Sequence, residues 1–418
     1  MNASKKRGWA VLGFSLVVWL MLSLSVPLST ALATQDQQQY PLYQNDARIQ
    51  QALEYLRTLQ NNDAGFSNPG EESALSNTQW AIMAIVAAGE DPREWKKNGR
   101  SPIDYLRENA NNLTGSTDYE RMILALVAAG DNPRDFAGRD FVAELKEDYV
   151  KENGQFSDFI YTTIWGILAL SSVEEDVSTS VLWLKGQQND DGGFAWAQGE
   201  KSDYDDTAAA LEALIAAGER PDSRVVRDAV AYLRTGQNED GGFRYFGSSP
   251  SNAASDAWII QAIAACGQNP GDEDWTVNGT NPVDHLVSLQ QQDGSFYYTS
   301  YTKSNPGYMT ACAIMALRGQ PHPIKPLPHV QPEPSRTPTP SATLEAPSTN
   351  IPPSAPPSTI RAQQPPAPTV TPPSAQTPNA SSESTDATAV AGFELLSGVS
   401  GLVVAAFTGL TRRKAKRS

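Results

Sequence analysis

The chain has 418 residues and a formal net charge of −15 at pH 7, with 30 prolines and only three histidines. Basic clusters lie at both ends, so the stretch between them is strongly acidic. A surface of this charge repels phosphate, which argues against nucleic-acid binding. Two of the three histidines, His322 and His329, fall in the Pro-rich part of the chain. A histidine-rich metal site or a histidine-based catalytic triad is therefore not expected in the fold.

The first 33 residues have the layout of a secretory signal. Lys5-Lys6-Arg7 precedes an apolar run from Trp9 to Leu24, and Ala31-Leu32-Ala33 offers a small-residue cleavage site. We therefore expect the protein to be exported, with an uncleaved N-terminal anchor as the alternative.

Residues 389–418 predict a membrane anchor. The apolar segment from Leu395 to Leu410 would span about 24 Å as a helix, and a basic run from Arg412 to Arg417 follows it. Basic residues remain on the cytoplasmic side. We therefore expect a transmembrane helix with the preceding chain outside, at the cell surface. The segment also resembles a processed surface-sorting tail.

Residues 321–388 are expected to form a disordered stalk between the fold and the anchor. Nineteen of the 30 prolines fall in residues 321–378. Such a composition buries too little apolar surface to fold and favours extended backbone. This leaves residues 34–320 as the globular part, which is long enough for one large core.

Two kinds of helix alternate in the globular part. Ala-rich apolar stretches, typical of buried helices, end at Gly89, Gly130, Ser171, Gly218, Gly267 and Gly319. Amphipathic segments precede them at 46–60, 101–110, 140–151, 176–187, 223–236 and 281–291. The simplest arrangement is an all-α fold, a single (α/α)6 toroid with six apolar helices inside and six amphipathic helices outside.

A glycine-rich turn with an aromatic residue recurs between the helices. It is found at residues 60–66, 188–194, 237–243 and 291–296. Glycine permits a positive φ, and the aromatic side chain can enter the core. These turns resemble the Gln–Trp repeats of the squalene-hopene cyclase and prenyltransferase superfamily, with Phe in place of Trp. The resemblance implies an α/α toroid.

One turn is followed by an acidic motif. The sequence Asp203-Tyr204-Asp205-Asp206-Thr207-Ala208 resembles the Asp-x-Asp-Asp-Thr-Ala motif of class II terpene cyclases. The resemblance implies that Asp205 is a general acid, supported by Asp203 and Asp206, in an intramolecular isomerase that cyclises a polyene or isoprenoid. Adjacent carboxyl groups cannot all ionise easily, so one can retain its proton at neutral pH.

Aromatic side chains could stabilise a cation formed near such an acid. The candidates for a substrate-binding wall are Trp80, Trp165, Phe194, Trp196, Trp258 and Tyr308. The acidic motif and the aromatic candidates also have a structural interpretation. One aspartate could be the N-cap of the following helix, and aromatic residues pack protein cores.

The residues leave the function open between catalysis and binding. The alternative to a cyclase is a non-catalytic extracytoplasmic module that binds a small hydrophobic or corrin-like ligand or a glycan, and a third hypothesis is a structural spacer. No metal-binding or phosphate-binding motif is present, so no metal and no cofactor are expected. Cys266 and Cys312 fit either a disulfide or two buried thiols.

Overall fold

The structure, a computed structural model, describes residues 39–327. The predicted export signal, most of the predicted stalk and the predicted C-terminal anchor lie outside these residues. Within residues 39–327, no helix is both long and apolar enough to cross a membrane.

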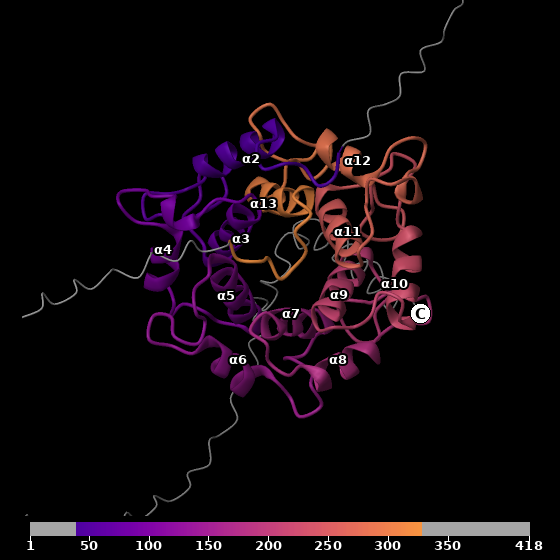
Figure 1. The fold of residues 1–418 in the computed structure, drawn as a ribbon, viewed down its shortest axis with the longest axis horizontal. Coiled ribbons are helices and arrows are strands. Elements are labelled where there is room, and N and C mark those ends of the chain that lie inside the picture. The colour runs from indigo at the N-terminus through magenta and orange to yellow at the C-terminus, as the bar shows by residue number, and fades with distance from the viewer. Residues whose placement is uncertain (1–38, 328–418) are drawn as a thin grey trace, which may run out of the picture. The chain divides into compact units, whose positions relative to one another are not determined.

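The helices form two concentric rings (Figure 1). The inner ring consists of α3 (Leu75–Ala87), α5 (Ser116–Ala129), α7 (Ile160–Ser171), α9 (Tyr204–Ala216), α11 (Ala253–Ala265) and α13 (Pro306–Leu317). The outer ring consists of α2 (Ala47–Thr58), α4 (Pro102–Glu108), α6 (Phe141–Tyr149), α8 (Ser178–Lys185), α10 (Arg224–Arg234) and α12 (Pro282–Ser288). Because α13 packs against both α11 and α3, the inner ring is closed. The predicted all-α toroid is confirmed for this part of the chain.

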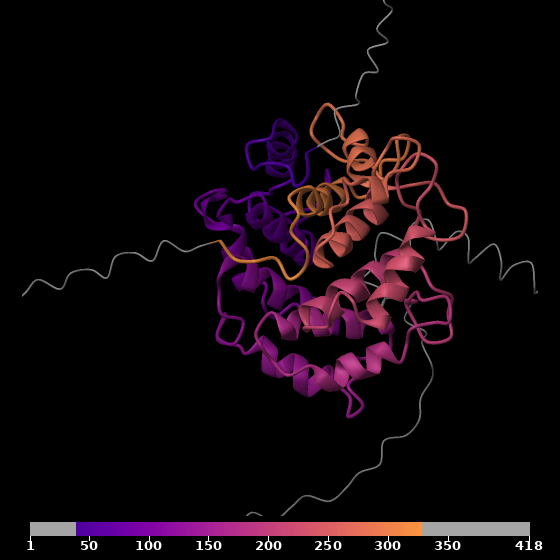
Figure 2. The same ribbon diagram turned by 45° about the vertical axis from the view of Figure 1, so that its right-hand side comes forward.

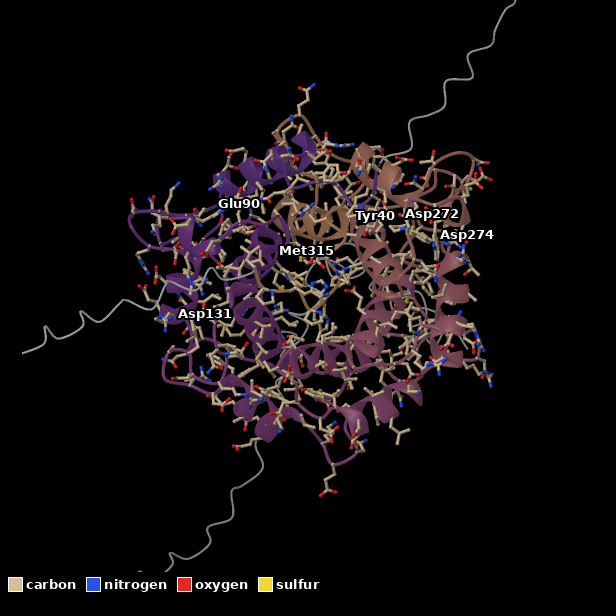
Figure 3. The ribbon with its side chains drawn as sticks, in the orientation of Figure 1. Tyr40, Glu90, Asp131, Asp272, Asp274 and Met315 are labelled. Carbon is tan, nitrogen blue, oxygen red and sulfur yellow. The ribbon has the colours of Figure 1, made fainter. Side chains whose placement is uncertain are left out.

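The two rings differ in burial as their sequences differ in composition. In α7, every residue from Ile160 to Leu170 is buried, including those on the side facing the centre of the ring. In α10, only Val225, Val226, Ala229 and Leu233 are buried. Figure 3 shows side chains extending into the centre of the ring, whereas Asp272 and Asp274 lie at its periphery. A helix that is apolar on all faces is stable only where all faces are covered.

In four of the six repeats, the glycine-rich turn is bonded to the following repeat. The side-chain Nε2 of the turn glutamine donates to a backbone carbonyl of the following outer segment: Gln60 to Trp95 (2.8 Å), Gln188 to Val225 (2.8 Å) and Gln237 to Trp275 (2.7 Å). In the last repeat, Gln290 donates to the carbonyl of Arg48 at 2.8 Å. The same bond that joins neighbouring repeats therefore also joins the end of the toroid to its beginning.

The aromatic residue of each turn is held by the inner helix that follows. Its backbone N–H donates to a threonine hydroxyl in four repeats, at distances of 2.8 to 3.0 Å, from Phe66 to Thr78, Phe156 to Thr163, Phe194 to Thr207 and Phe296 to Thr310. In the fifth repeat, Phe243 donates instead to a carboxyl oxygen of Asp256 at 2.7 Å. The turn is thus bonded to the inner ring and to the outer ring at once.

The chain beyond α13 turns back across the centre of the ring (Figures 1 and 2). His322 and Ile324 are 3% and 1% exposed. The sequence ends the toroid at residue 320 and assigns His322 to the stalk, whereas the structure continues the folded part to residue 327. The backbone here is non-helical, as its proline content predicts, but it is buried because the inner helices supply its hydrogen-bond partners.

Gly192 and Gly199 give a matched test of the turn geometry. Both have a positive φ, of 87° and 79°. A Cβ added at Gly192 would lie 2.6 Å from the carbonyl oxygen of Asp228 in α10. A Cβ added at Gly199 would meet nothing within 4 Å. We expect Gly192→Ala to lower the free energy of unfolding by about 2 kcal/mol more than Gly199→Ala, because backbone cannot move aside without repacking. Urea denaturation of both variants measures this difference. Equal losses would show that φ, and not the contact between repeats, requires the glycine.

Candidate active site

Asp203 begins α9 and is its N-cap. Its Oδ1 accepts a hydrogen bond from the N–H of Asp206 at 2.8 Å, and its own N–H donates to the carbonyl of Phe194 at 3.0 Å. Aspartate is preferred at this position because its carboxyl group satisfies a helix N–H that has no partner within the helix. Capping therefore accounts for Asp203 and leaves Asp205 and Asp206 to be explained otherwise.

Asp205 lies in the first turn of α9, on the side that faces the centre of the ring. It precedes Glu212 by about two helical turns, so the two side chains share one face of the helix. Glu212 reaches the central segment, where its Oε2 accepts from the N–H of His322. Asp205 is 3% exposed, and its Oδ1 is buried with no hydrogen-bond partner within residues 39–327.

The acidic motif retains protons into the neutral range. Burial raises the pKa of Asp205 to about 7, although a hydrogen bond with Ser255 lowers it. Burial likewise raises the pKa of Asp206 to about 6. Burial and the neighbouring Asp206 raise the pKa of Asp203 well above its ordinary value. A protonated carboxyl group in a buried site is the condition that a general acid requires at neutral pH.

Two tyrosines from the following turns lie beside these carboxyl groups. The Tyr245 carbonyl accepts from the N–H of Tyr204 at 3.1 Å, and the Tyr298 carbonyl accepts from the N–H of Ala253 at 2.9 Å. Burial, followed by the carboxyl groups of α9, raises the pKa of the Tyr245 phenol, and burial and Asp205 raise that of Tyr298. Both phenols therefore remain protonated and can donate hydrogen bonds near Asp205.

Glu120 of α5 adds a further buried carboxyl group on the other side of α7. It is fully buried, and the Ser116 side chain at the start of α5 is its hydrogen-bonding neighbour. Burial raises its pKa well above the ordinary value, although Arg121 lowers it. Burial, followed by the charges of Glu120 and Asp206, raises the pKa of Tyr161 in α7 to about 12. Acidic groups thus line this end of the inner ring from α5 to α9.

Four of the six predicted aromatic residues come together at the centre of the ring. Trp80, Trp165 and Trp258, from α3, α7 and α11, have ring centroids 5.4 to 6.0 Å apart, and Tyr308 of α13 lies 5.2 Å from Trp80. Their planes meet at 78° to 80°, the edge-to-face arrangement that aromatic rings favour. These rings contact one another across the centre.

The other two predicted aromatic residues lie apart from this cluster. Phe194 is buried in its turn, where its N–H is bonded to Thr207. Trp196 is 41% exposed, and its ring centroid lies 5.4 Å from that of Phe159. The Trp196 carbonyl accepts from the N–H of Ile160 at 3.0 Å, which places the residue at the start of α7.

Asp256 and His285 form a buried pair that the sequence did not reveal. His285 Nδ1 lies 2.6 Å from Asp256 Oδ2, while Asp256 Oδ1 accepts from the N–H of Phe243. Although burial favours the neutral ring, Asp256 and Asp240 raise the pKa of His285. Four other repeats place a threonine where Asp256 stands, and in two of these, Tyr105 and Tyr232 take the place of His285 beside the turn glycine. The pair is therefore a substitute for a threonine–tyrosine arrangement, and it stabilises the turn.

The candidate site residues that the sequence did not reveal differ in whether the sequence contains a pattern that could have indicated them. Asp256 is the single acidic residue of an otherwise apolar helix, a pattern that marks a buried polar group. Glu120 stands beside Asp118 and Arg121 at the start of α5, so nothing in the sequence distinguishes it from an exposed residue. Tyr245 and Tyr298 follow the turn aromatic at the same spacing as Trp196. His322 carried no such signal, because its neighbours are prolines.

Within residues 39–327, no group of three or more His, Cys, Asp and Glu side chains is arranged to hold a metal ion. Cys266 and Cys312 are both buried and free. Burial raises the pKa of Cys266 to about 11, so this thiol is not a nucleophile at neutral pH.

The pKa of Asp205 predicts how stability varies with pH. Between about pH 4 and pH 7 the folded protein keeps a proton on Asp205 that the unfolded chain has lost, so stability falls as pH rises through this window. The quantity to compare is the free energy of unfolding of Asp205→Asn minus that of the wild type. We expect this difference to be higher at pH 8 than at pH 4, by up to about 4 kcal/mol. Urea denaturation at both pH values measures this, with exposed Asp222→Asn as the control. The same difference at both pH values would mean that Asp205 is ionised throughout.

The repeat comparison predicts the behaviour of the Asp256–His285 pair. His285→Tyr leaves the buried Asp256 without its partner, so we expect a loss of about 3 kcal/mol in the free energy of unfolding. Adding Asp256→Thr recreates the arrangement of Thr207 and Tyr232, and most of the loss should be recovered. Urea denaturation of the single and double variants tests this. A double variant no more stable than His285→Tyr would show that the two repeats are not interchangeable.

Comparison with known proteins gives the family. The sequence matches the model of the prenyltransferase alpha-alpha toroid domain over residues 13–119 and 135–327. No curated protein sequence matches the chain.

Solved structures share the architecture at low sequence identity. The type II terpene cyclase MstE from Scytonema is 14% identical, with a TM-score of 0.50 over 65% of this chain and 96% of that chain. A variant of the same enzyme in complex with geranylgeranyl dihydroxybenzoate gives 14% identity and a TM-score of 0.51, with the same coverage. An alpha-amylase from Clostridium perfringens is 13% identical, with a TM-score of 0.49 over 65% and 97% of the two chains. Likeness at such identities shows the fold alone. With the family model matching most of its length, the chain belongs to the prenyltransferase alpha-alpha toroid family.

Proposed function

We propose that the toroid is an isomerase similar to class II terpene cyclases, which uses Asp205 to protonate a polyene or isoprenoid. The observation that carries the proposal is the buried Oδ1 of Asp205, which has no partner within residues 39–327 and lies on the face of α9 that looks into the ring. A pKa of about 7 keeps a proton available on this group at neutral pH.

The proposed reaction consumes no cofactor. The proton of Asp205 passes to one carbon of an alkene, whose π electrons form the new C–H bond, and the neighbouring carbon becomes a cation that the next double bond attacks. Loss of a proton from the final cation returns a proton to the protein. Ser255 bonds the carboxylate that remains on Asp205, and the phenols of Tyr245 and Tyr298 lie close to it.

The aromatic cluster supports the same chemistry. Trp80, Trp165 and Trp258 lie at the centre of the ring toward which Asp205 is directed. The face of an indole ring attracts a cation. The Scytonema neighbour, also a toroid of similar extent, is a terpene cyclase whose complex contains an isoprenoid-bearing substrate. An isoprenoid is therefore the first substrate class to test.

A second candidate function is binding without chemistry. It is favoured by the contacts among the three tryptophans, which occupy the centre of the ring together with His322. In this case the ligand would be a small hydrophobic or corrin-like molecule or a glycan. For either function, the predicted signal and anchor imply an exported protein that is tethered to the membrane, with its toroid outside the cell.

Product analysis tests the proposal directly. The purified full chain, Asp205→Asn and the exposed-site control Asp222→Asn are incubated with squalene, oxidosqualene, linear polyprenols and geranylgeranyl dihydroxybenzoate. Extracts are analysed by gas chromatography or liquid chromatography with mass spectrometry. We expect a cyclised product from the wild type and the control, reduced at least about 100-fold in Asp205→Asn because the acid is missing.

The same samples distinguish the second function. If no substrate is converted but one of them raises the unfolding temperature of the wild type, the protein is a binding module. If product forms equally with Asp205→Asn, the acid has been assigned to the wrong residue.

A further inference from the structure

The centre of the toroid, between the same three tryptophans that support the proposed function, is filled by the chain itself. The imidazole of His322 is stacked on Trp258, with ring centroids 5.3 Å apart and planes at 27°. Trp80 and Trp165 present near-perpendicular rings to it at 5.8 and 5.6 Å. The three tryptophans come from alternate helices of the inner ring, so the imidazole is enclosed from three sides. Its side chain is fully buried.

Two polar side chains of the inner ring hold this segment. Glu212 Oε2 accepts from the N–H of His322 at 2.6 Å and lies 3.2 Å from its Nδ1. Gln261 Nε2 donates to the carbonyl of Gln320 at 2.8 Å and lies 3.3 Å from the same Nδ1. Glu212 and Gln261 are themselves fully buried in the second half of α9 and α11. Polar side chains in such positions are unfavourable unless they are bonded, so their presence is explained by what they bind.

His322 satisfies this site only in part. Glu212 Oε1 and Gln261 Oε1 are buried acceptors with no hydrogen-bond partner within residues 39–327, and His322 Nε2 is unpartnered as well. A buried acceptor without a donor is unfavourable. A flat ring that carries several N–H donors would fit the tryptophans as His322 does and would also bond the two free acceptors.

The segment can leave without opening the ring. It follows α13, the last helix of the toroid, and the contact of α13 with α3 closes the inner ring without it. Figure 1 shows the segment crossing the centre of the ring after α13. Its hold on the inner ring rests on the contacts of Gln320 and His322 described above and on the buried Ile324.

We propose that His322 is a tethered ligand of this central site and competes there with a diffusible aromatic amidinium or guanidinium compound. Glu212 and Gln261 provide the acceptors for the N–H groups of that compound, and the three tryptophans provide the flat walls. Binding displaces residues 320–324 from the ring. This inference does not depend on the chemistry proposed for Asp205, because its readouts are binding and opening, not turnover.

Benzamidine is a suitable probe, because it joins a flat ring to an amidinium group, and benzyl alcohol is the matched control without that group. Hydrogen–deuterium exchange of the full chain is followed by mass spectrometry. We expect saturating benzamidine to speed exchange of the His322 amide at least about tenfold while the amides of α9 and α11 are not accelerated. Benzyl alcohol should leave all of them unchanged.

The variant His322→Gly removes the competitor, so benzamidine should bind it at least about tenfold more tightly than the wild type, as measured by calorimetry and by the rise in unfolding temperature. Adding Glu212→Gln should weaken that binding, because the anionic acceptor is lost. Benzamidine that binds neither protein, or that binds both equally and leaves the His322 amide protected, would show that the segment is a fixed part of the core. If His322→Gly does not fold, the exchange of the wild type with and without benzamidine decides the question alone.

Discussion

In four of the six repeats of the described toroid, a glutamine side chain reaches a backbone carbonyl of the following outer segment and so joins two neighbouring repeats. The last of these bonds, from Gln290 to Arg48, joins the end of the toroid to its beginning. The same turn lies so close to the backbone of α2 that its residue 294 must lack a side chain, because a Cβ on Gly294 would overlap the carbonyl of Gln51. The ring therefore closes through backbone contacts that only a short list of residue types permits. The other features described above depend on this closure.

Closure buries the inner helices on the side that faces the centre as well as on the side that faces the outer ring. Carboxyl groups that would be ionised on the surface of an open helical array, such as Asp205 and Glu120, then lose their water. Their pKa values rise for this reason before any effect of neighbouring charge. The same enclosure brings Trp80, Trp165 and Trp258 into contact from three alternate helices. The acidic and aromatic parts of the candidate site thus have one physical origin.

The fold was predictable because its signals are local and repeated. The apolar and amphipathic helices differ in periodicity, and the turn recurs in register with them. The repeats therefore support the same assignment, although the pattern of each one alone is weak. The acidic motif was found through its resemblance to the Asp-x-Asp-Asp-Thr-Ala motif of class II terpene cyclases. Its Asp205 and Asp206 stand where the first repeat has Ser76 and Asn77. The pair of Asp256 and His285 was missed because its two members are separate, ordinary-looking substitutions on different helices. Their relation is visible only when the helices are side by side.

The sequence by itself determined the number of helices and their division into two layers, since both follow from the spacing of apolar and turn residues along the chain. It also determined the position of the acidic motif, whose residues are adjacent in the sequence. It did not determine which aspartate caps α9, because Asp203, Asp205 and Asp206 are all chemically able to do so. Nor did it determine the place of His322, whose proline neighbours favour an extended backbone whether that backbone is exposed or buried. The first point is decided locally, since Asp203 lies just before α9 and its Oδ1 accepts from the N–H of Asp206. The second is decided by the closed ring, because it alone brings Glu212, Gln261 and the three tryptophans to the same place as the end of the folded chain.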